Sequence, residues 1–173
     1  MNATINLENK HFPVLLNELI SIISPLYGGT FIDCTFGQGG YSKKILENKE
    51  NNIIAIDRDK DVLMSASKFE KKYSNRFKFY NIKFSKLNKI KLKNNDLRGI
   101  IFDLGYSINQ IKNSKRGLSF NDKGKLNMRM GINDFSANDF ISSMDENSLS
   151  KVFKIFGGER YSKKIAREIV KIR

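Results

Sequence analysis

The chain has 173 residues, of which 40% are hydrophobic and 28% charged, so it can bury one domain-sized core and is not a disordered chain. One cysteine, Cys34, and one histidine, His11, exclude an internal disulfide and a Cys/His zinc cage, and we expect no metal site. No apolar run approaches the roughly 20 residues that span a bilayer, and the polar opening residues are unlike a secretory signal. These features predict a cytoplasmic protein without a membrane partner.

The net charge is strongly positive, with 31 Lys and Arg against 18 Asp and Glu, a balance of +13. Such an excess favours a polyanionic partner, with nucleic acid ahead of an anionic membrane surface. Drift of an A/T-rich genome toward Lys, Asn and Ile accounts for part of it. The segment from Lys68 to Arg98 nevertheless holds eleven basic residues and two acids, a local excess of +9.

The first part of the chain alternates predicted helices and strands. In chain order we expect a helix over 14–23, a strand over 30–36, a short helix over 42–48, a strand over 52–57, an amphipathic helix over 60–73, and strands over 77–81 and 99–103. Between the last two strands, the Lys/Asn-biased segment 86–95 is expected to be a loop or the approach to a strand. This order predicts a parallel α/β sheet of the doubly wound, Rossmann-like type.

The later part of the chain is less regular. Residues 104–135 have no clear period and many Gly, Asn, Ser and Lys, which predicts a long irregular segment. Ser136 with Asp139 predicts the capped start of a helix. Apolar stripes predict two more helices, one through 149–156 and one over 159–173. With four strands visible, the sheet looks unfinished, and we expect the N-terminal portion of a larger protein.

The strongest local motif is DCTFGQGG at 33–40. A strand that ends in a glycine-rich turn and opens a helix lets backbone N–H groups approach a ligand, because no Cβ stands in the way. Asp57 follows at the end of the next predicted strand, where an acid accepts hydrogen bonds from ribose hydroxyls. Together they predict a site for an adenosine-containing cofactor at the carboxyl ends of the strands.

Two cofactors compete for this site. A dinucleotide needs G-x-G-x-x-G/A, whereas the register from Gly37 reads GQGGYS, with Ser42 in the third slot. S-adenosylmethionine has no phosphate and needs only the glycine turn, an acid before it (Asp33) and the ribose acid (Asp57). The pattern therefore favours the methyl donor over NAD, while a tight turn that binds nothing remains the third interpretation.

Asp103-Leu104-Gly105 follows the fourth predicted strand and is the third candidate element. In this topology the end of that strand lies beside the reacting methyl group, so Asp103 would meet both the donor and the acceptor. The alternative is that Asp103 caps the following turn.

Seven segments occur in one order and resemble the RsmH (MraW) family, the ribosomal RNA small subunit methyltransferase H enzymes. They are HFPVLLNE (11–18), DCTFGQGG (33–40), AIDRD (55–59), DLGYSINQI (103–111), RGLSF (116–120), LNMRM (126–130) and GGERYSKKIAREIVKIR (157–173). The resemblance implies a Rossmann-like methyltransferase core with a helical domain inserted after the fourth strand. We therefore expect the core over 1–111 and the beginning of an inserted, RNA-facing domain over 112–173.

The resemblance also implies the reaction, which is methyl transfer from S-adenosylmethionine to the exocyclic N4 of a cytidine of 16S rRNA, in the decoding centre of the small ribosomal subunit. It implies cofactor contacts at Gly39, Gly40, Tyr41, Asp57, Phe84, Asp103 and Gln110. Asp103 is also the expected catalytic residue, and Arg116 and Arg129 are expected to bind RNA, along with the basic face of the terminal helix. Without the family, Phe84 would be assigned to the core.

The sequence departs from the family pattern at several positions. Tyr41 stands where His is usual, DLGYSI replaces DLGVSS, and Asn127 stands where Asp is usual. The later SFHSLED segment is absent, which leaves the activity of this chain open. Two alternatives therefore stay beside the methyltransferase: a catalytically incomplete RNA-binding fragment, and an NAD-linked α/β oxidoreductase. The oligomeric state is not predicted.

Overall fold

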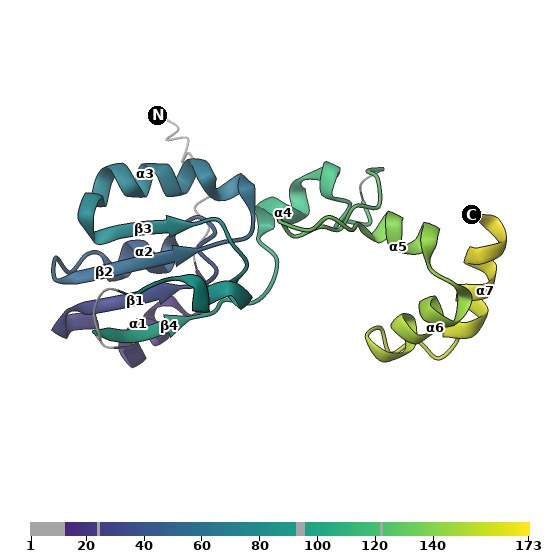
Figure 1. Ribbon diagram of the computed structural model, residues 1–173, viewed down its shortest axis with the longest axis horizontal. Helices are drawn as coiled ribbons and strands as arrows, with labels where there is room; N and C mark the ends of the chain where they lie inside the picture. Colours follow the sequence, from purple (N-terminus) through teal and green to yellow (C-terminus); the bar gives the residue numbers. More distant parts are fainter. Residues whose placement is uncertain (1–12, 24, 93–95, 122) are drawn as a thin grey trace, which may run out of the picture. The chain divides into compact units, whose positions relative to one another are not determined.

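The computed structural model describes residues 13–23, 25–92, 96–121 and 123–173 (Figure 1). It divides into two compact units, Met1–Ile108 and Asn109–Arg173. The division falls close to the expected limit at residue 111, and the expected tasks of the two parts stay predictions. The polar opening residues and His11 lie outside the described residues.

The first unit is built on a four-stranded sheet. Its strands are β1 (Gly29–Asp33), β2 (Asn51–Ile56), β3 (Phe77–Tyr80) and β4 (Leu97–Ile101). All pairings are parallel and the order is β3-β2-β1-β4, which confirms the predicted Rossmann-like α/β fold. Because parallel strands end at a common edge, the residues that follow β1, β2 and β4 come together there.

One face of the sheet carries the main core. The helices α1 (Leu16–Ile23), α2 (Gly40–Ile45) and α3 (Leu63–Tyr73) pack against it. The ring of Phe36 is its centre, with ring centroids of Phe69, Phe77 and Phe79 at 5.2 to 5.5 Å. The first unit also contains three short 3₁₀ turns, which are η1 (Pro25–Tyr27), η2 (Lys60–Val62) and η3 (Ser74–Arg76).

The opposite face of the sheet is covered by a segment that the sequence did not predict. Ile32, Cys34 and Ile56 are buried there, and they pack against Leu87 and Ile90. These two belong to η4 (Phe84–Lys89) and its end, a pair of 3₁₀ turns with a kink at Lys86. The expectation of a loop or strand approach over 86–95 is thus wrong up to Lys89, because Leu87 and Ile90 are spaced by three and turn inward together.

The first strand is also shorter than expected. The sequence predicts it to residue 36, but β1 ends at Asp33. The Phe36 N–H donates to the carbonyl of Ile56 at 3.0 Å. The chain therefore stops pairing as a strand after Asp33 and crosses the end of β2. The glycine turn then begins beside the end of that strand.

The second unit consists of short helices. They are α4 (Ile108–Lys112, which begins at the boundary), η5 (Ser114–Arg116), α5 (Ala137–Ser143), α6 (Glu146–Ile155) and α7 (Ser162–Ile172). The predicted start of α5 is confirmed, since Ser136 and Asp139 form a reciprocal capping box. Leu149 and Ala166 are fully buried in this unit. The short helices α4 and η5 interrupt the segment that was expected to be irregular.

Candidate functional site

The glycine turn joins β1 to α2. Gly39 has a φ of 77°, and a Cβ there would lie 2.6 Å from the ring of Phe69 and 2.7 Å from that of Phe36. A Cβ on Gly40 would collide with the ring of Pro13. Both glycines are therefore required by packing, whatever they bind, and their role as cofactor contacts stays a prediction.

Asp33 ends β1 and is completely buried. Its Oδ2 accepts a hydrogen bond from Ser42 Oγ at 2.7 Å, and its Oδ1 accepts one from the Thr35 N–H at 3.3 Å. Burial raises the pKa of this carboxyl to about 6, against the lowering effect of the two donors. Asp33 thus joins the end of the strand to the helix that follows the turn, and it has no exposed surface for a ligand.

Asp57 follows β2 and is only partly buried. Its Oδ2 accepts the Gly37 N–H at 2.8 Å, and its Oδ1 accepts the Asp59 N–H at 2.8 Å. Burial raises the pKa of the Asp57 carboxyl, and the backbone donors oppose the rise. The structure thus brings Asp57 onto the glycine turn, as the spacing of the two motifs predicted. Each oxygen has a further lone pair for a ligand.

Tyr41 lies in α2, and its side chain points into the protein. The ring is 6% exposed, and the hydroxyl donates to the Val14 carbonyl at 2.6 Å. Burial and the nearby charge of Asp103 raise the pKa of the Tyr41 phenol to about 12. A contact of Tyr41 with the cofactor would therefore use its backbone.

Asp103 lies at the same edge of the sheet. Its Oδ2 is 3.4 Å from the Tyr41 hydroxyl, and its backbone N–H donates to Thr35 Oγ1 at 2.7 Å. Thr35 therefore fixes the chain after β4 against the chain after β1. Sequence reasoning gave Thr35 no role and placed Ser42 only in the register of the glycine turn, because the hydrogen bonds of both residues depend on the fold.

Phe84, which could have been an ordinary core aromatic, is 40% exposed. Its ring meets that of Phe102 edge-on, with ring centroids 5.4 Å apart, and Phe102 is 48% exposed. The segment η4 therefore crosses the sheet from β3 to β4, which are at opposite edges, and brings two open aromatic rings to the chain beside Asp103. Phe102 is a candidate that sequence reasoning missed.

The remaining predicted site residues belong to the second unit. Gln110 lies in α4, and its role at the cofactor site stays a prediction. Arg116 is 9% exposed and its guanidinium donates to the carbonyl of Arg129 at 3.3 Å. Arg129 Nε donates to Asn127 Oδ1 at 2.8 Å. Both arginines hold this segment together, and their binding to RNA stays a prediction.

The departure at Asn127 has a structural consequence. Its Oδ1 accepts from both the backbone N–H of Arg129, at 3.2 Å, and the Arg129 side chain. An amide oxygen can take two donors in the same way as one carboxylate oxygen. The contact to Arg129 therefore does not require the usual aspartate.

Two further observations concern the types of site that the chain can hold. In the described residues, no group of three or more His, Cys, Asp and Glu side chains is arranged to hold a metal ion. No helix in the part of the chain that the structure covers is both long and apolar enough to cross a membrane.

The sequence matches the family model described as the MraW methylase family over residues 8–173. The chain belongs to this family. Three relatives are named Ribosomal RNA small subunit methyltransferase H. The protein of Orientia tsutsugamushi (strain Ikeda) is 42% identical over 164 residues, which are 95% of this chain and 53% of the relative. That of Ehrlichia ruminantium (strain Welgevonden) is 40% identical over 169 residues, 94% of this chain and 56% of the relative.

The third relative, from Rickettsia bellii (strain OSU 85-389), is 39% identical over 167 residues, 96% of this chain and 54% of the relative. The chain thus spans about half the length of the curated relatives it matches. The resemblance to the RsmH (MraW) family is confirmed. Membership of the MraW family also implies use of a methyl donor.

Proposed function

We propose that this chain carries the S-adenosylmethionine-binding part of a methyltransferase that acts on small-subunit ribosomal RNA. The observation that supports it most is the Asp57 carboxylate. It is held against the glycine turn by the Gly37 N–H at 2.8 Å and is still partly exposed. An anchored carboxylate with free lone pairs suits the two hydroxyls of a ribose.

The residues at this edge fit S-adenosylmethionine better than NAD. Asp57 would hold the ribose, and the half-exposed rings of Phe84 and Phe102 offer an apolar surface for an adenine. Ser42 stands in the slot where a dinucleotide site needs Gly or Ala for a close helix approach, and its hydroxyl is bonded to buried Asp33. When bound, S-adenosylmethionine supplies an electrophilic methyl group on a sulfonium sulfur.

Asp103 is the proposed acid–base participant. A cytosine amine is a weak nucleophile because its lone pair is delocalised into the ring, so it gains from being oriented and from losing positive charge as it reacts. The Asp103 carboxylate would accept a hydrogen bond from the amine N–H and take the proton as the methyl group passes from the sulfonium sulfur, which leaves as a neutral thioether, to the amine nitrogen. Thr35, which binds the backbone of Asp103 at 2.7 Å, would keep it in position.

The substrate would be the exocyclic N4 of a cytidine in 16S rRNA at the decoding centre, splayed out of its stack to reach the site. The names of the relatives support a small-subunit rRNA substrate. Arg116 and Arg129 would act in RNA binding chiefly by shaping the segment that carries them. Such a substrate would place the protein in the cytoplasm, with ribosomal subunits.

The test is methyl transfer from labelled S-adenosylmethionine to small ribosomal subunits. It would be run with this chain and with a chimera completed by the second half of a relative. We expect Asp103→Ala, in the active form, to lose transfer by a much larger factor than it loses affinity for the cofactor. Transfer at the parental rate by Asp103→Ala would contradict the assignment of Asp103. Binding of RNA without any binding of S-adenosylmethionine would support the non-catalytic alternative.

A further inference from the structure

A surface of lysines lies on the side of the sheet away from α3, over β3 and η4. Between residues 78 and 91 the chain has five lysines and no Asp or Glu. We call this set the η4 lysine surface. It consists of Lys78, Lys83, Lys86, Lys89 and Lys91.

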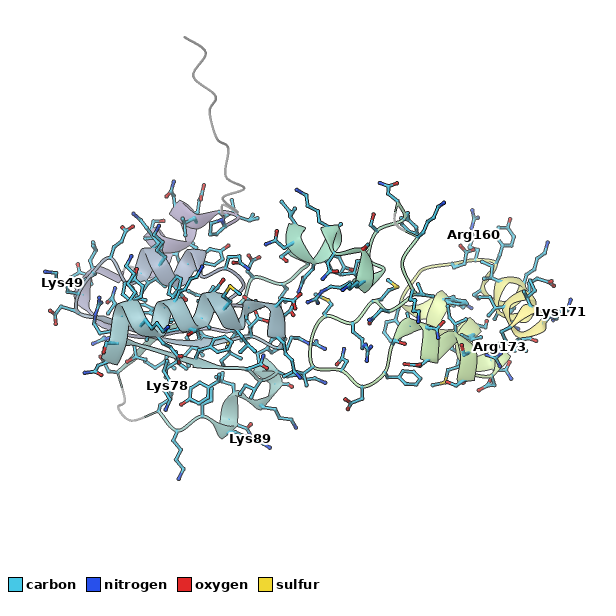
Figure 2. All side chains as sticks on the ribbon, turned by 90° about the horizontal axis from the view of Figure 1, so that it is seen from above. Lys49, Lys78, Lys89, Arg160, Lys171 and Arg173 are labelled. Atoms are coloured by element: carbon cyan, nitrogen blue, oxygen red, sulfur yellow. The ribbon has the colours of Figure 1, made fainter. Side chains whose placement is uncertain are left out.

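The local fold turns these lysines outward. Leu87 and Ile90 pack against the sheet, whereas Lys86, Lys89 and Lys91 are exposed. In β3, Phe77 and Phe79 face the main core, so the alternation of the strand sends Lys78 to the face that η4 covers. Figure 2 shows Lys78 and Lys89 projecting along the same margin of this unit.

Three of the lysines recur at a regular interval in the sequence. Lys83, Lys86 and Lys89 are three residues apart, along two successive 3₁₀ turns with a kink at Lys86. Several amines are therefore carried by one short stretch of chain. A nucleic-acid backbone, which has a negative charge on every phosphate, can contact more than one of them at once.

The lysines are also not neutralised. Within the described residues, no ion pair involves any of the five, and the amine of Lys78 lies over the Tyr80 ring, 5.0 Å from its centroid. The basic helix α7 differs, because Lys171 pairs with Glu168 at 2.9 Å and Arg167 with Glu146 at 3.5 Å. A larger share of the charge on the η4 lysine surface is therefore available to a partner.

We propose that the η4 lysine surface binds the phosphate backbone of the substrate RNA. The identity of that RNA rests on the proposed function, but the surface itself does not. Phe84 begins η4 and is a predicted residue of the cofactor site, so a strand bound along these lysines would run beside that site. Phosphate contacts of this kind fix the register of a nucleic acid without reading its bases.

The test compares two triple variants of the full chain. Lys86→Ala/Lys89→Ala/Lys91→Ala removes three charges from the surface. Lys68→Ala/Lys71→Ala/Lys72→Ala removes three exposed charges from α3, on the other face of the sheet. A third variant, with Lys86, Lys89 and Lys91 changed to Arg, keeps the charge. Binding of a fluorescent single-stranded RNA from the small subunit is followed by anisotropy over a range of salt concentrations.

We expect the η4 triple variant to bind RNA at least about tenfold more weakly at 0.1 M salt, and the slope of log K against log salt to fall by about 2, at roughly 0.7 per lost contact. The α3 variant should stay within about twofold of the parent, and the arginine variant should bind as the parent does. Equal losses in the two alanine variants would overturn the proposal. So would an unchanged affinity in the η4 variant.

Two further measurements, of cofactor binding and of vesicle binding, separate this proposal from its alternatives. Calorimetric titration with S-adenosylmethionine should give the same affinity for the parent and the η4 variant. If the parent binds RNA through these lysines but does not bind S-adenosylmethionine, the proposed function is wrong, and the proposal that the η4 lysine surface binds RNA is still supported. If the lysines bind vesicles of phosphatidylcholine and phosphatidylserine, and the parent does not bind the RNA, the surface is a membrane contact and the proposal is wrong.

Discussion

Asp33 and Asp57 end neighbouring parallel strands, yet the fold gives them opposite surroundings. Asp33 is completely buried, with one oxygen bound by Ser42 and the other by Thr35. Asp57 is partly exposed, with one backbone donor on each oxygen. Burial raises both pKa values, so a displaced pKa does not separate the two roles. What separates them is the acceptor capacity left on the exposed side.

At one edge of the sheet, the buried side chain of Asp33 has a structural role, and the partly exposed carboxylate of Asp57 is left to bind a ligand. Asp33 joins β1 to α2 through its hydrogen bonds to Thr35 and Ser42. Asp57 accepts the Gly37 N–H of the glycine turn and keeps lone pairs for a ligand. Four substitutions test this division, in order of decreasing expected effect.

Asp57→Ala should have the largest effect on the cofactor. Two charge-assisted hydrogen bonds to ribose hydroxyls contribute about 1.5–3 kcal/mol each, so the affinity for S-adenosylmethionine should fall by about a hundredfold or more. Calorimetric titration measures it. The matched control is Asp61→Ala, an exposed acid of η2, which should bind as the parent does. An affinity within about twofold of the parent for Asp57→Ala would mean that Asp57 does not hold the ribose.

Asp33→Asn should change the pH dependence of stability and leave cofactor binding at neutral pH almost unchanged. The folded-state pKa is raised from 3.8 to about 6, so the contribution of Asp33 to the free energy of unfolding is fully present below pH 3.8 and is lost as the pH rises through 6. The loss is about 3 kcal/mol. Urea unfolding between pH 3.5 and about 7 should show a larger fall in the parent than in the variant, which keeps the contribution of Asp57. Identical pH profiles would contradict the account of Asp33.

Ser42→Ala should destabilise the fold by about 2 kcal/mol at neutral pH, because the buried carboxylate of Asp33 loses its side-chain donor. The same loss should raise the pKa of Asp33 further, since the hydroxyl lowers it. Chemical denaturation measures the first effect. The exposed Ser85 offers a control, and Ser85→Ala should leave stability unchanged. A larger loss of cofactor affinity than of stability would mean that Ser42 faces the ligand.

Tyr41→Phe should have the smallest effect. It removes the hydrogen bond to the Val14 carbonyl, formed at 2.6 Å, at a cost of about 1 kcal/mol in stability. Cofactor affinity should barely change, because the ring is buried. Tyr73→Phe, on α3, is the matched control and should cost less. A tenfold loss of affinity in Tyr41→Phe would place its hydroxyl at the ligand.

Much of the fold was predictable from local patterns. Short segments rich in apolar and aromatic residues located all four strands, and the glycines with Asp57 located the edge where they meet. The capping box at Ser136 was read correctly because it is formed by residues three apart. What the sequence did not reveal depends on contacts through space. Thr35 reaches Asp103, 68 positions away, and no periodicity records that pairing.

One misreading has a clear physical cause. Segment 86–95 was expected to be a loop or the approach to a strand because its composition is biased to Lys and Asn, but two apolar residues spaced by three were enough to dock its first part as η4. The binding of RNA by Arg116, expected from the segment it shares with the family, stays a prediction, and the structure adds that this residue is 9% exposed and donates to the Arg129 carbonyl. The average composition of a segment does not show whether it packs on the sheet, because that depends on the positions of its few apolar or hydrogen-bonding groups.

The most direct test of the account is a crystal structure of the chain grown with S-adenosylmethionine. The account predicts both ribose hydroxyls on the Asp57 carboxylate, the adenine against Phe84 and Phe102, and no contact between the ligand and Asp33. A structure with the ligand absent, or with its ribose away from Asp57, would contradict it.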